Sequence, residues 1–274
     1  MTFSIELSDK TILLDRTHVT DAYNILYPFA LEETLCRKMT TSMTPIVHLW
    51  RHPKAFVMGL RDSRLPHAAN ADIWLKSQGY ETGVRNSGGA AVPLDLGVIN
   101  VSLLLPKPAG SMEHRKDFEL MAQLIRETLM KLTDDVQKGE VAGSFCPGEF
   151  DLSIGGKKFC GIAQRRQLHA ISVQAFVIVE GQGEQKAAVA RAFYDRAAAG
   201  AEAADYPVVL PGSMASLAEC VGKPLTAVDF IQSMKELLEA GEITAQIWSE
   251  ELAGENEIQE MVKLMENRYG INRN

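Results

Sequence analysis

The sequence has no apolar run approaching the roughly 18 residues that a membrane-spanning helix requires, no Cys-x-x-Cys pair and no basic excess. No membrane span is therefore expected. The N-terminal segment lacks a basic stretch followed by an apolar one, so no secretory signal is predicted. The net charge of −7 argues against a dedicated nucleic-acid-binding protein, although a local basic patch could still dock an acidic partner.

Cysteine is sparse, and none of the four cysteines is close to another in the sequence. They stand at Cys36, Cys146, Cys160 and Cys220. Cysteines and histidines do not cluster with metal-ligand spacing, so no metal site is predicted. A cytoplasmic protein with reduced thiols is the simplest interpretation. Each thiol is expected to be a small buried apolar group unless its context indicates another role.

The apolar periodicity predicts an α+β protein, in which a mixed sheet is flanked by helices. Helices are expected at 21–40, with Asp21 as a cap and Pro28 in the first turn, and at 71–80, 113–133, 184–199, 226–240 and 244–267. Strands are expected at 46–50, 55–60, 98–106 and 170–181, a hairpin at 151–164 and loops at 82–92 and 201–225. We expect a main domain over 1–225 and a helical extension over 226–274 packed on it.

A glycine-centred loop follows Arg85 in the stretch RNSGGAAVPLDLG. Gly88 and Gly89 allow the backbone to approach a ligand closely, and Arg85 offers a fixed cationic fork. Asp95 and Gly97 indicate a second turn nearby. The stretch is neither a P-loop nor a dinucleotide fingerprint. A tight turn between two strands, without any ligand, is the alternative interpretation.

Cys146 differs from the other cysteines because it lies in a Gly-Ser-Phe-Cys-Pro-Gly loop without apolar periodicity. Lys158, at the start of the second strand of the hairpin, can fold back towards this loop. An ammonium about 4 Å from the sulfur, at an effective dielectric of about 20, would favour the nucleophilic thiolate by up to roughly 4 kcal/mol. The residues alone leave open an inert thiol beside a solvated lysine.

The two segments together resemble the lipoate-protein ligase and lipoyl/octanoyl transferase superfamily. RNSGGAAVPLDLGVIN is similar to the acyl-binding loop of that superfamily, and DLSIGGKKFCGIAQRR is similar to its hairpin. LWRHPKAFVMGLRD matches its early strand pair. The resemblance covers roughly residues 20–250 and implies a biotin/lipoate ligase-like catalytic domain over 1–225.

The resemblance also implies site residues. It places the active-site lysine at Lys158, and it places acyl-binding residues at Arg85, Ser87, Gly88, Gly89, Ala90, Asp95, Gly161, Ala163 and Gln164. Three positions depart from the family pattern. Ala90 stands where a third glycine is usual, Pro93 where an aromatic is common and Leu94 where the ligases and many transferases have histidine. Because the ligases activate lipoate as an adenylate, these departures put ATP use in doubt.

The run from Gly143 to Ile154 resembles one subgroup, the octanoyl-[glycine cleavage H protein]:protein N-octanoyltransferases. This resemblance implies that Cys146 carries the acyl group as a thioester and that Lys158 favours its thiolate. The implied enzyme is an amidotransferase of lipoate assembly. It would move octanoyl from the H protein to lipoyl domains of 2-oxoacid dehydrogenase E2 subunits. One amide is exchanged for another, so no cofactor is expected.

Three alternatives stay open. The donor could instead be an octanoyl-acyl-carrier protein, the enzyme could be an ATP-dependent lipoate ligase in which Cys146 is incidental, or the chain could be a non-catalytic lipoyl-domain binder. Arg165 and Arg166, or Arg61 and Arg64, are candidates for contact with an acidic partner domain, although ordinary solvated charge is the simpler interpretation for each.

Overall fold

The computed structural model describes residues 11–21, 23–41, 43–107, 114–202, 206–240 and 253–271. Its centre is a seven-stranded sheet with the order β1-β2-β6-β10-β9-β8-β7. The strands are β1 (Ile12–Asp15), β2 (Ile46–Trp50), β6 (Val98–Pro106), β7 (Gln137–Lys138), β8 (Leu152–Ile154), β9 (Lys157–Arg166) and β10 (Ala170–Ile178). Only β1 and β2 run parallel among these neighbours. The expected mixed sheet is therefore confirmed.

A second, three-stranded sheet has the order β4-β3-β5, from β3 (Lys54–Met58), β4 (Glu81–Val84) and β5 (Val92–Asp95). It overturns the prediction that 82–92 is entirely loop. The glycine-centred segment is the connection between β4 and β5. Pro93 lies inside β5, which is tolerated because β5 is an edge strand and an edge residue can lack its N–H. This proline masked the strand in the sequence.

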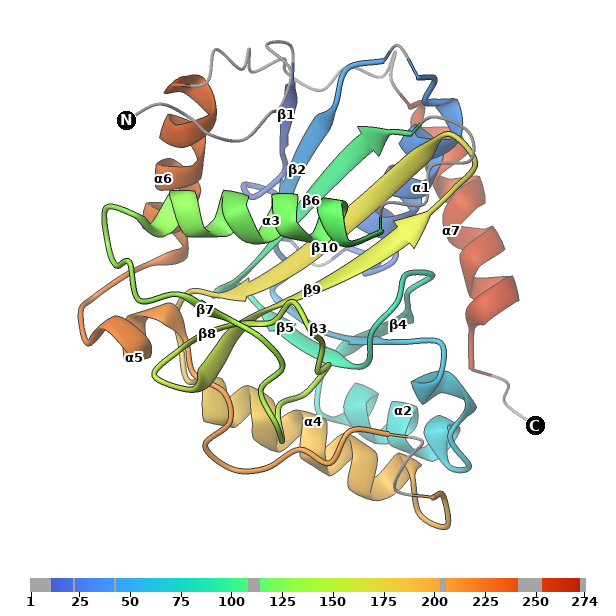
Figure 1. Cartoon of the computed structure of the whole chain (residues 1–274). Coiled ribbons are helices and arrows are strands. Elements are labelled where there is room, and N and C mark those ends of the chain that lie inside the picture. The colour runs from blue at the N-terminus through green and yellow to red at the C-terminus, as the bar shows by residue number, and fades with distance from the viewer. Residues whose placement is uncertain are drawn as a thin grey trace.

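Helices cover the sheets on separate sides (Figure 1). They are α1 (Tyr27–Lys38), α2 (Ala68–Ser77), α3 (His114–Leu129), α4 (Gly183–Ala197), α5 (Leu217–Val221), α6 (Ala227–Ala240) and α7 (Glu255–Tyr269). A 3-10 turn, η1 (Asp62–Arg64), precedes α2. Helix α3 crosses one face of the large sheet, whereas α2 and α4 lie beside the small sheet. None of the described helices is long and apolar enough to traverse a bilayer.

Alternation along β10 separates two cores. Val173 and Val177 face a core shared with α3 and α6, whereas Phe176 and Ile178 face a core shared with α1, α4, α7 and the small sheet. Successive strand residues point to opposite faces, so this strand is buried on both sides. Cys146 and the end of the glycine-centred loop belong to the core shared with α1, α4, α7 and the small sheet. The candidate residues of the sequence analysis therefore meet between the two sheets.

Several sequence expectations change at their boundaries. Helix α1 begins at Tyr27 with Pro28 in its first turn as predicted, but its N-cap is Leu26 and not Asp21. The segment 201–225 contains α5, whose Ser216 and Glu219 form a capping box and whose end is the left-handed Gly222. The first part of the predicted helix 244–267 lies outside the described residues, and α7 begins at Glu255.

The helical extension contributes to both cores. Phe230 and Met234 of α6 lie in the core with α3, whereas Ile258 and Met265 of α7 lie in the core with α1. The division of the chain at residue 225 stays a prediction. Because α6 packs into one core and α7 into the other, we expect the extension to unfold together with the rest of the protein.

Candidate active site

Cys146 occupies a constrained loop between α3 and β8. Its φ of 48° makes it the one non-glycine residue with a left-handed backbone in the part of the chain that the structure describes. Such a conformation is held only where surrounding contacts impose it. The side chain is 7% exposed. Its Sγ accepts hydrogen bonds from Arg85 Nη2 at 3.3 Å and from the backbone N–H of Ala90 at 3.2 Å. A guanidinium and an N–H are the contacts that a negatively charged sulfur needs.

Gly89 makes this contact possible. Its φ is +88°, and a Cβ at this position would lie 2.5 Å from Arg85 Nη2 and 2.8 Å from Cys146 Sγ. Any other residue would force the guanidinium and the sulfur apart. Arg85 Nη2 also donates to the carbonyl oxygen of Ala90 at 2.9 Å. The loop thus wraps around one guanidinium nitrogen.

Lys158 is fully buried and binds the backbone beside Cys146. Its Nζ donates to the carbonyl oxygens of Phe145 at 2.9 Å and Cys146 at 2.6 Å, and it lies 2.9 Å from Asp151 Oδ2. The three ammonium hydrogens therefore each have an acceptor. The hairpin does bring Lys158 to the loop, as the sequence suggested, but the hydrogen-bond partners of the sulfur are Arg85 and Ala90. The lysine fixes the backbone of the candidate nucleophile.

Asp151 completes this buried pair and was not singled out from the sequence. It is 1% exposed, and Oδ2 also accepts from the Gly148 N–H at 3.1 Å. Burial raises the pKa of Asp151 to about 6 although the Lys158 ammonium opposes the shift. The sequence did carry an indication of this pair. Asp151 and Lys158 stand on opposite sides of the Gly155-Gly156 turn, and a hairpin brings its two strands together.

An open cleft of about 530 Å³ lies beside the residues next to the sulfur, because Ala90, whose N–H binds Sγ, and Pro147 both line it. It is lined by Leu60, Arg61, Asp62, Ser87, Gly88, Gly89, Ala90, Pro147, Tyr206 and Pro207. Four predicted acyl-binding residues, from Ser87 to Ala90, thus share one wall. Ser87 Oγ is buried without a hydrogen-bond partner. The cleft has the size of a small-ligand site, and its lining combines apolar residues with the polar side chains of Arg61, Asp62 and Ser87.

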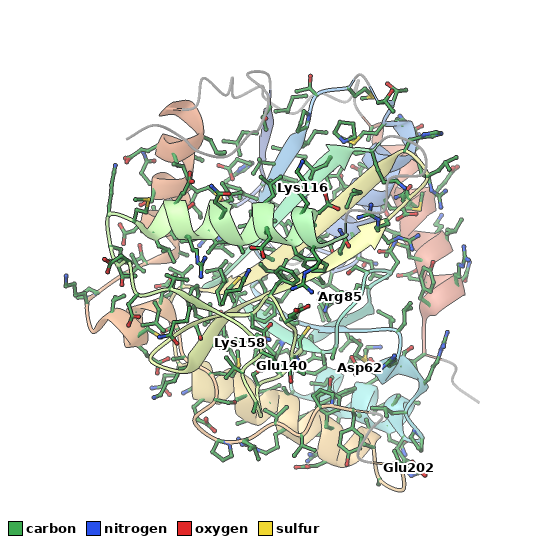
Figure 2. The ribbon with its side chains drawn as sticks, in the orientation of Figure 1. Asp62, Arg85, Lys116, Glu140, Lys158 and Glu202 are labelled. Atoms are coloured by element: carbon green, nitrogen blue, oxygen red, sulfur yellow. The ribbon has the colours of Figure 1, made fainter. Side chains whose placement is uncertain are left out.

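Asp62 is a cleft residue that sequence reasoning missed. Arg85, Lys158 and Asp62 come from three distant elements and lie in the central region of the molecule (Figure 2). Asp62 accepts from the Gly59 N–H at 2.7 Å and from Tyr194 Oη at 3.0 Å. Burial raises the pKa of Asp62 to about 6. Tyr194 Oη in turn accepts from the Ala91 N–H at 3.1 Å, so the acid supports the end of the glycine-centred loop.

A second, inner cavity lies between the two sheets and is lined in part by Arg85. It is lined by residues of both sheets and α1, among them Phe29, Trp50, Val57, Asn100 and Phe176. Its volume of about 20 Å³ holds roughly one water molecule and no eight-carbon chain. Trp50 Nε1, Asn100 Nδ2 and Arg85 Nε are buried and unpaired there, which suits a bound water.

Other predicted residues lie away from the sulfur. Asp95 binds the Gly97 N–H at 2.9 Å and Lys186 Nζ at 2.6 Å, so it ends β5 and ties it to α4. The side chain of Gln164 donates to Asp117 on α3, whereas its carbonyl oxygen accepts from the Gly88 N–H at 3.3 Å. This backbone contact still links β9 to the loop.

The small residues of β9 have a packing role. A Cβ on Gly161 would lie 2.5 Å from the Phe176 ring and 3.1 Å from the Lys158 stem. Ala163 is buried on the same strand. The two arginines that follow are not free for an acidic partner: Arg165 pairs with Glu33 at 3.0 Å and Arg166 pairs with Asp117 at 2.6 Å.

The other three cysteines are structural. Cys36 and Cys160 are 2% and 0% exposed, as predicted for core residues, and burial raises the pKa of both thiols. Burial also raises the pKa of the half-buried Cys220 to about 11. No group of His, Cys, Asp and Glu side chains among the described residues has the arrangement of a metal site. Cys146 is thus the thiol with a charged donor and an adjoining cleft.

Comparison with known proteins identifies close relatives. Residues 24–239 match the model of the lipoyl protein ligase A/B catalytic domain. An octanoyl-[GcvH]:protein N-octanoyltransferase from Anoxybacillus flavithermus is 40% identical over 230 residues, 83% of each chain. A lipoyl-[GcvH]:protein N-lipoyltransferase from Listeria monocytogenes is 34% identical over 87% of this chain and 88% of its own.

Solved structures agree on the fold. A lipoate-protein ligase A bound with ATP superposes with a TM-score of 0.71 at 19% identity, covering 96% of this chain and 99% of its own. A bipartite lipoate protein ligase from Thermoplasma acidophilum gives a TM-score of 0.70 at 20% identity, covering 97% and 98%. At such low identity the likeness establishes the architecture alone.

Proposed function

This chain belongs to the lipoyl protein ligase A/B catalytic domain family, and we propose that it moves an octanoyl group between protein lysines with Cys146 as the acyl carrier. It is an acyltransferase, like its relatives of 36–40% identity that are named octanoyl-[GcvH]:protein N-octanoyltransferases. The donor would be the octanoylated glycine cleavage H protein. The acceptor would be a lipoyl domain of a 2-oxoacid dehydrogenase E2 subunit.

One observation carries the proposal. Cys146 Sγ lies within hydrogen-bond distance of Arg85 Nη2 and of the Ala90 N–H, beside a cleft walled by the glycine-centred loop. A thiolate is the reactive form of cysteine, and a neighbouring cation favours it. Lys158 supports the same atom indirectly, because it holds the carbonyl oxygen of Cys146.

The first half-reaction breaks an amide. The Cys146 thiolate attacks the carbonyl carbon of octanoyl-lysine and a tetrahedral oxyanion forms. The oxyanion collapses, the C–N bond breaks, and the lysine amine leaves with a proton taken from water in the open cleft. The sulfur loses its negative charge to the carbonyl oxygen when the S–C bond of the tetrahedral intermediate forms. Arg85 and the Ala90 N–H, which bound the thiolate, then become available to the carbonyl oxygen of the acyl group.

The second half-reaction regenerates the enzyme with a free Cys146 thiolate. The amine of the acceptor lysine attacks the thioester carbon and gives its proton to water in the cleft, the C–S bond breaks and the thiolate re-forms at Arg85. Amide is exchanged for amide, so the cycle balances without ATP. The octanoyl chain would lie along Gly88, Gly89 and Ala90 in the cleft. At about 0.8 kcal/mol per buried methylene, six methylenes contribute roughly 5 kcal/mol to binding.

The direct test is an intact mass of the protein after incubation with a donor and acid quenching. With octanoylated H protein, the expected product is one octanoyl adduct that disappears in Cys146→Ser. Cys220→Ser is the matched control, because it makes the same substitution at a half-buried thiol outside the cleft, and it should retain the adduct. Subsequent addition of a lipoyl domain should discharge the adduct.

The competing activities give different results. An adduct formed only with octanoyl-acyl-carrier protein would replace the proposed donor. Labelling of the lipoyl domain that requires ATP and free lipoate, without any adduct on Cys146, would identify a ligase and overturn the transferase. Binding of lipoyl domains without adduct or labelling would identify a non-catalytic binder.

A further inference from the structure

Glu33 is a buried carboxylate that the proposed chemistry does not use. It lies on α1 and is 5% exposed. Burying a carboxylate is unfavourable unless hydrogen bonds and positive charge compensate it. Here Oε2 accepts from Asn86 Nδ2 at 2.9 Å, Arg165 Nε at 3.0 Å and Gln167 Nε2 at 3.0 Å. Oε1 accepts from Arg165 Nη2 at 3.2 Å and Arg37 Nη2 at 3.4 Å.

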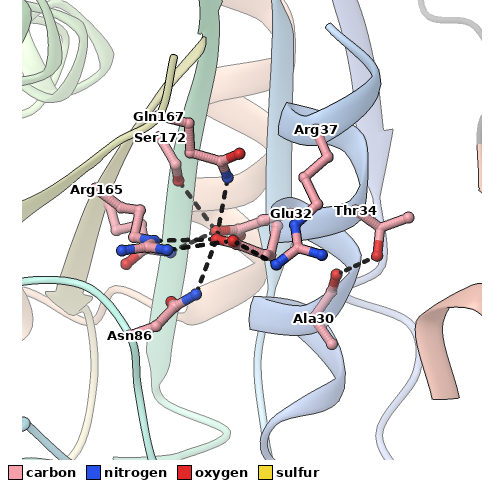
Figure 3. A network of polar contacts seen from close by, with 10 residues as sticks. Ala30, Glu32, Thr34, Arg37, Asn86, Arg165, Gln167 and Ser172 are labelled. Carbon is pink, nitrogen blue, oxygen red and sulfur yellow. Dashed lines mark hydrogen bonds and ion pairs between the residues drawn. The ribbon is translucent and has the colours of Figure 1, made fainter. Parts of the chain in front are cut away.

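These donors belong to separate parts of the fold. Figure 3 shows Asn86, Arg165 and Gln167 converging on one carboxylate beside Glu32. Asn86 belongs to the glycine-centred loop, Arg165 lies near the end of β9 and Gln167 lies between β9 and β10. One side chain of α1 therefore joins the loop to the β9–β10 connection of the large sheet.

The loop side of this network leads directly to the sulfur. Asn86 is the residue after Arg85, whose Nη2 reaches Cys146 Sγ. Asn86 is 6% exposed, and its amide is bonded to Glu33. A hydrogen bond to a charged acceptor is worth roughly 1.5–3 kcal/mol, so this contact restricts the backbone on which Arg85 stands. The Gly88 N–H, bonded to the Gln164 carbonyl oxygen, ties the same loop to the same strand.

We propose that Glu33 is a positioning residue, which through Asn86 holds the Arg85 guanidinium at the sulfur of Cys146. The inference rests on the proposed function for the role of that sulfur. Glu33 touches neither the sulfur nor the cleft wall. Its effect is on geometry. Without the hydrogen bond from Asn86 to Glu33, the glycine-centred loop shifts and the Arg85 guanidinium moves out of hydrogen-bond distance of the sulfur.

The first experiment compares two partners of the same carboxylate. Asn86→Ala removes the contact to the loop, whereas Arg37→Ala, the matched control, removes an exposed contact to the same carboxylate within α1. Two quantities are measured in folded protein: the alkylation rate of Cys146 by iodoacetamide at pH 7, from mass spectrometry of its peptide, and kcat and KM for octanoyl transfer.

Asn86→Ala is expected to slow alkylation several-fold and to lower kcat by roughly 10- to 100-fold, the usual effect of misplacing a reactive group by about 1 Å. KM should change less, because the cleft wall from Ser87 to Ala90 keeps its side chains. Arg37→Ala should match the wild type in both measurements. Glu33→Gln should resemble Asn86→Ala, since it weakens the same bond.

A paired exchange separates positioning from general destabilisation. In Glu33→Gln/Asn86→Asp the donor and acceptor of the contact trade places, so the hydrogen bond can re-form. The single change Asn86→Asp brings two carboxylates together and should be the most impaired variant. The kcat of the double variant should be at least tenfold higher than that of Asn86→Asp. Two independent losses would instead make the double variant slower than either single variant. Urea midpoints of all variants verify that each is folded.

Two outcomes overturn the inference. One is equal alkylation and equal kcat in Asn86→Ala, Arg37→Ala and the wild type. The other is strictly additive loss in the exchanged pair. Failure of the proposed function looks different, because wild-type protein would then form no octanoyl adduct while the alkylation rates would still separate Asn86→Ala from Arg37→Ala.

Discussion

Replacing Lys158 by methionine tests whether the buried lysine holds the backbone of the nucleophile or only neutralises Asp151. Methionine keeps most of the length and the apolar stem but loses the ammonium. The change removes three contacts: the two carbonyl oxygens of Phe145 and Cys146, and the ion pair with Asp151. Each partner is buried, so water cannot replace the lost donor without local opening.

The expected magnitude follows from this inventory. Removing one partner of a buried ion pair costs about 3–5 kcal/mol. The double variant Lys158→Met/Asp151→Asn removes the stranded charge and should recover most of that loss. It should remain roughly 1–3 kcal/mol less stable than the wild type, because the two carbonyl oxygens still lack their donor. Octanoyl loading of Cys146 should stay low in both variants, since the left-handed backbone of Cys146 is no longer held.

The loss in Lys158→Met should depend on pH. Burial already raises the pKa of Asp151 to about 6 in the presence of Lys158, against an ordinary value of 3.8. A carboxyl group whose pKa is raised in the folded state is destabilising where it is ionised, so stability falls as pH rises from about 3.8 to about 6 and then levels off. Without the ammonium the pKa of Asp151 rises further. Urea unfolding should therefore show a smaller loss at pH 5 than at pH 8.

Two results would refute this reasoning. If the double variant regains both stability and octanoyl loading, Lys158 serves only to neutralise Asp151, and the positioning role is wrong. If Lys158→Met unfolds at the wild-type urea concentration at pH 8, the buried pair does not contribute as described. Loading is followed by intact mass, and Cys220→Ser serves again as the reference for a substitution outside the site.

Asp62→Asn should stabilise the protein at pH 8 by about 1–2 kcal/mol in urea unfolding. Because the pKa of Asp62 is raised to about 6, its ionised form destabilises the folded protein by roughly 3 kcal/mol, and Asn avoids this cost but loses one hydrogen bond. The stabilisation by Asp62→Asn should vanish near pH 4, where the carboxyl group is protonated in the folded protein. Lower stability of Asp62→Asn than of the wild type at pH 8 would contradict this. Gly89→Ala should lower the free energy of unfolding by at least about 1 kcal/mol and abolish octanoyl loading of Cys146. Gly88→Ala, whose added Cβ meets nothing closer than 3.7 Å, should keep the wild-type urea midpoint. Equal urea midpoints of the two variants would exclude the clash at Gly89. Arg85→Lys should slow loading of Cys146 about tenfold in rapid-quench measurements, because one ammonium cannot reproduce the planar fork; wild-type loading would show that charge alone suffices.

Much of the fold follows from local pattern. The periodicity of α3 and the apolar runs of β2, β6 and β10 predicted these elements within a few residues, because helix and strand preferences depend on neighbours a few positions apart. The short strand β5 was missed because Pro93 reads as a breaker. It becomes a strand only as an edge partner of β3, and this pairing is a long-range property.

The candidate site divides in the same way. Cys146 was distinguished by its Gly/Pro loop, Lys158 by its place after the hairpin turn and Gly88-Gly89 by their adjacency, all of which are local features. By itself the sequence thus determined most of the longer helices and strands, the family and these candidates.

Only the tertiary structure decided their partners. Arg85 stands 61 positions before Cys146, yet its guanidinium binds the sulfur, whereas Lys158 binds the backbone instead. Glu33 stands 53 positions before Asn86 and meets it through the packing of α1 on the large sheet. Such contacts depend on strand register and on how the two sheets face each other, and no local pattern encodes either.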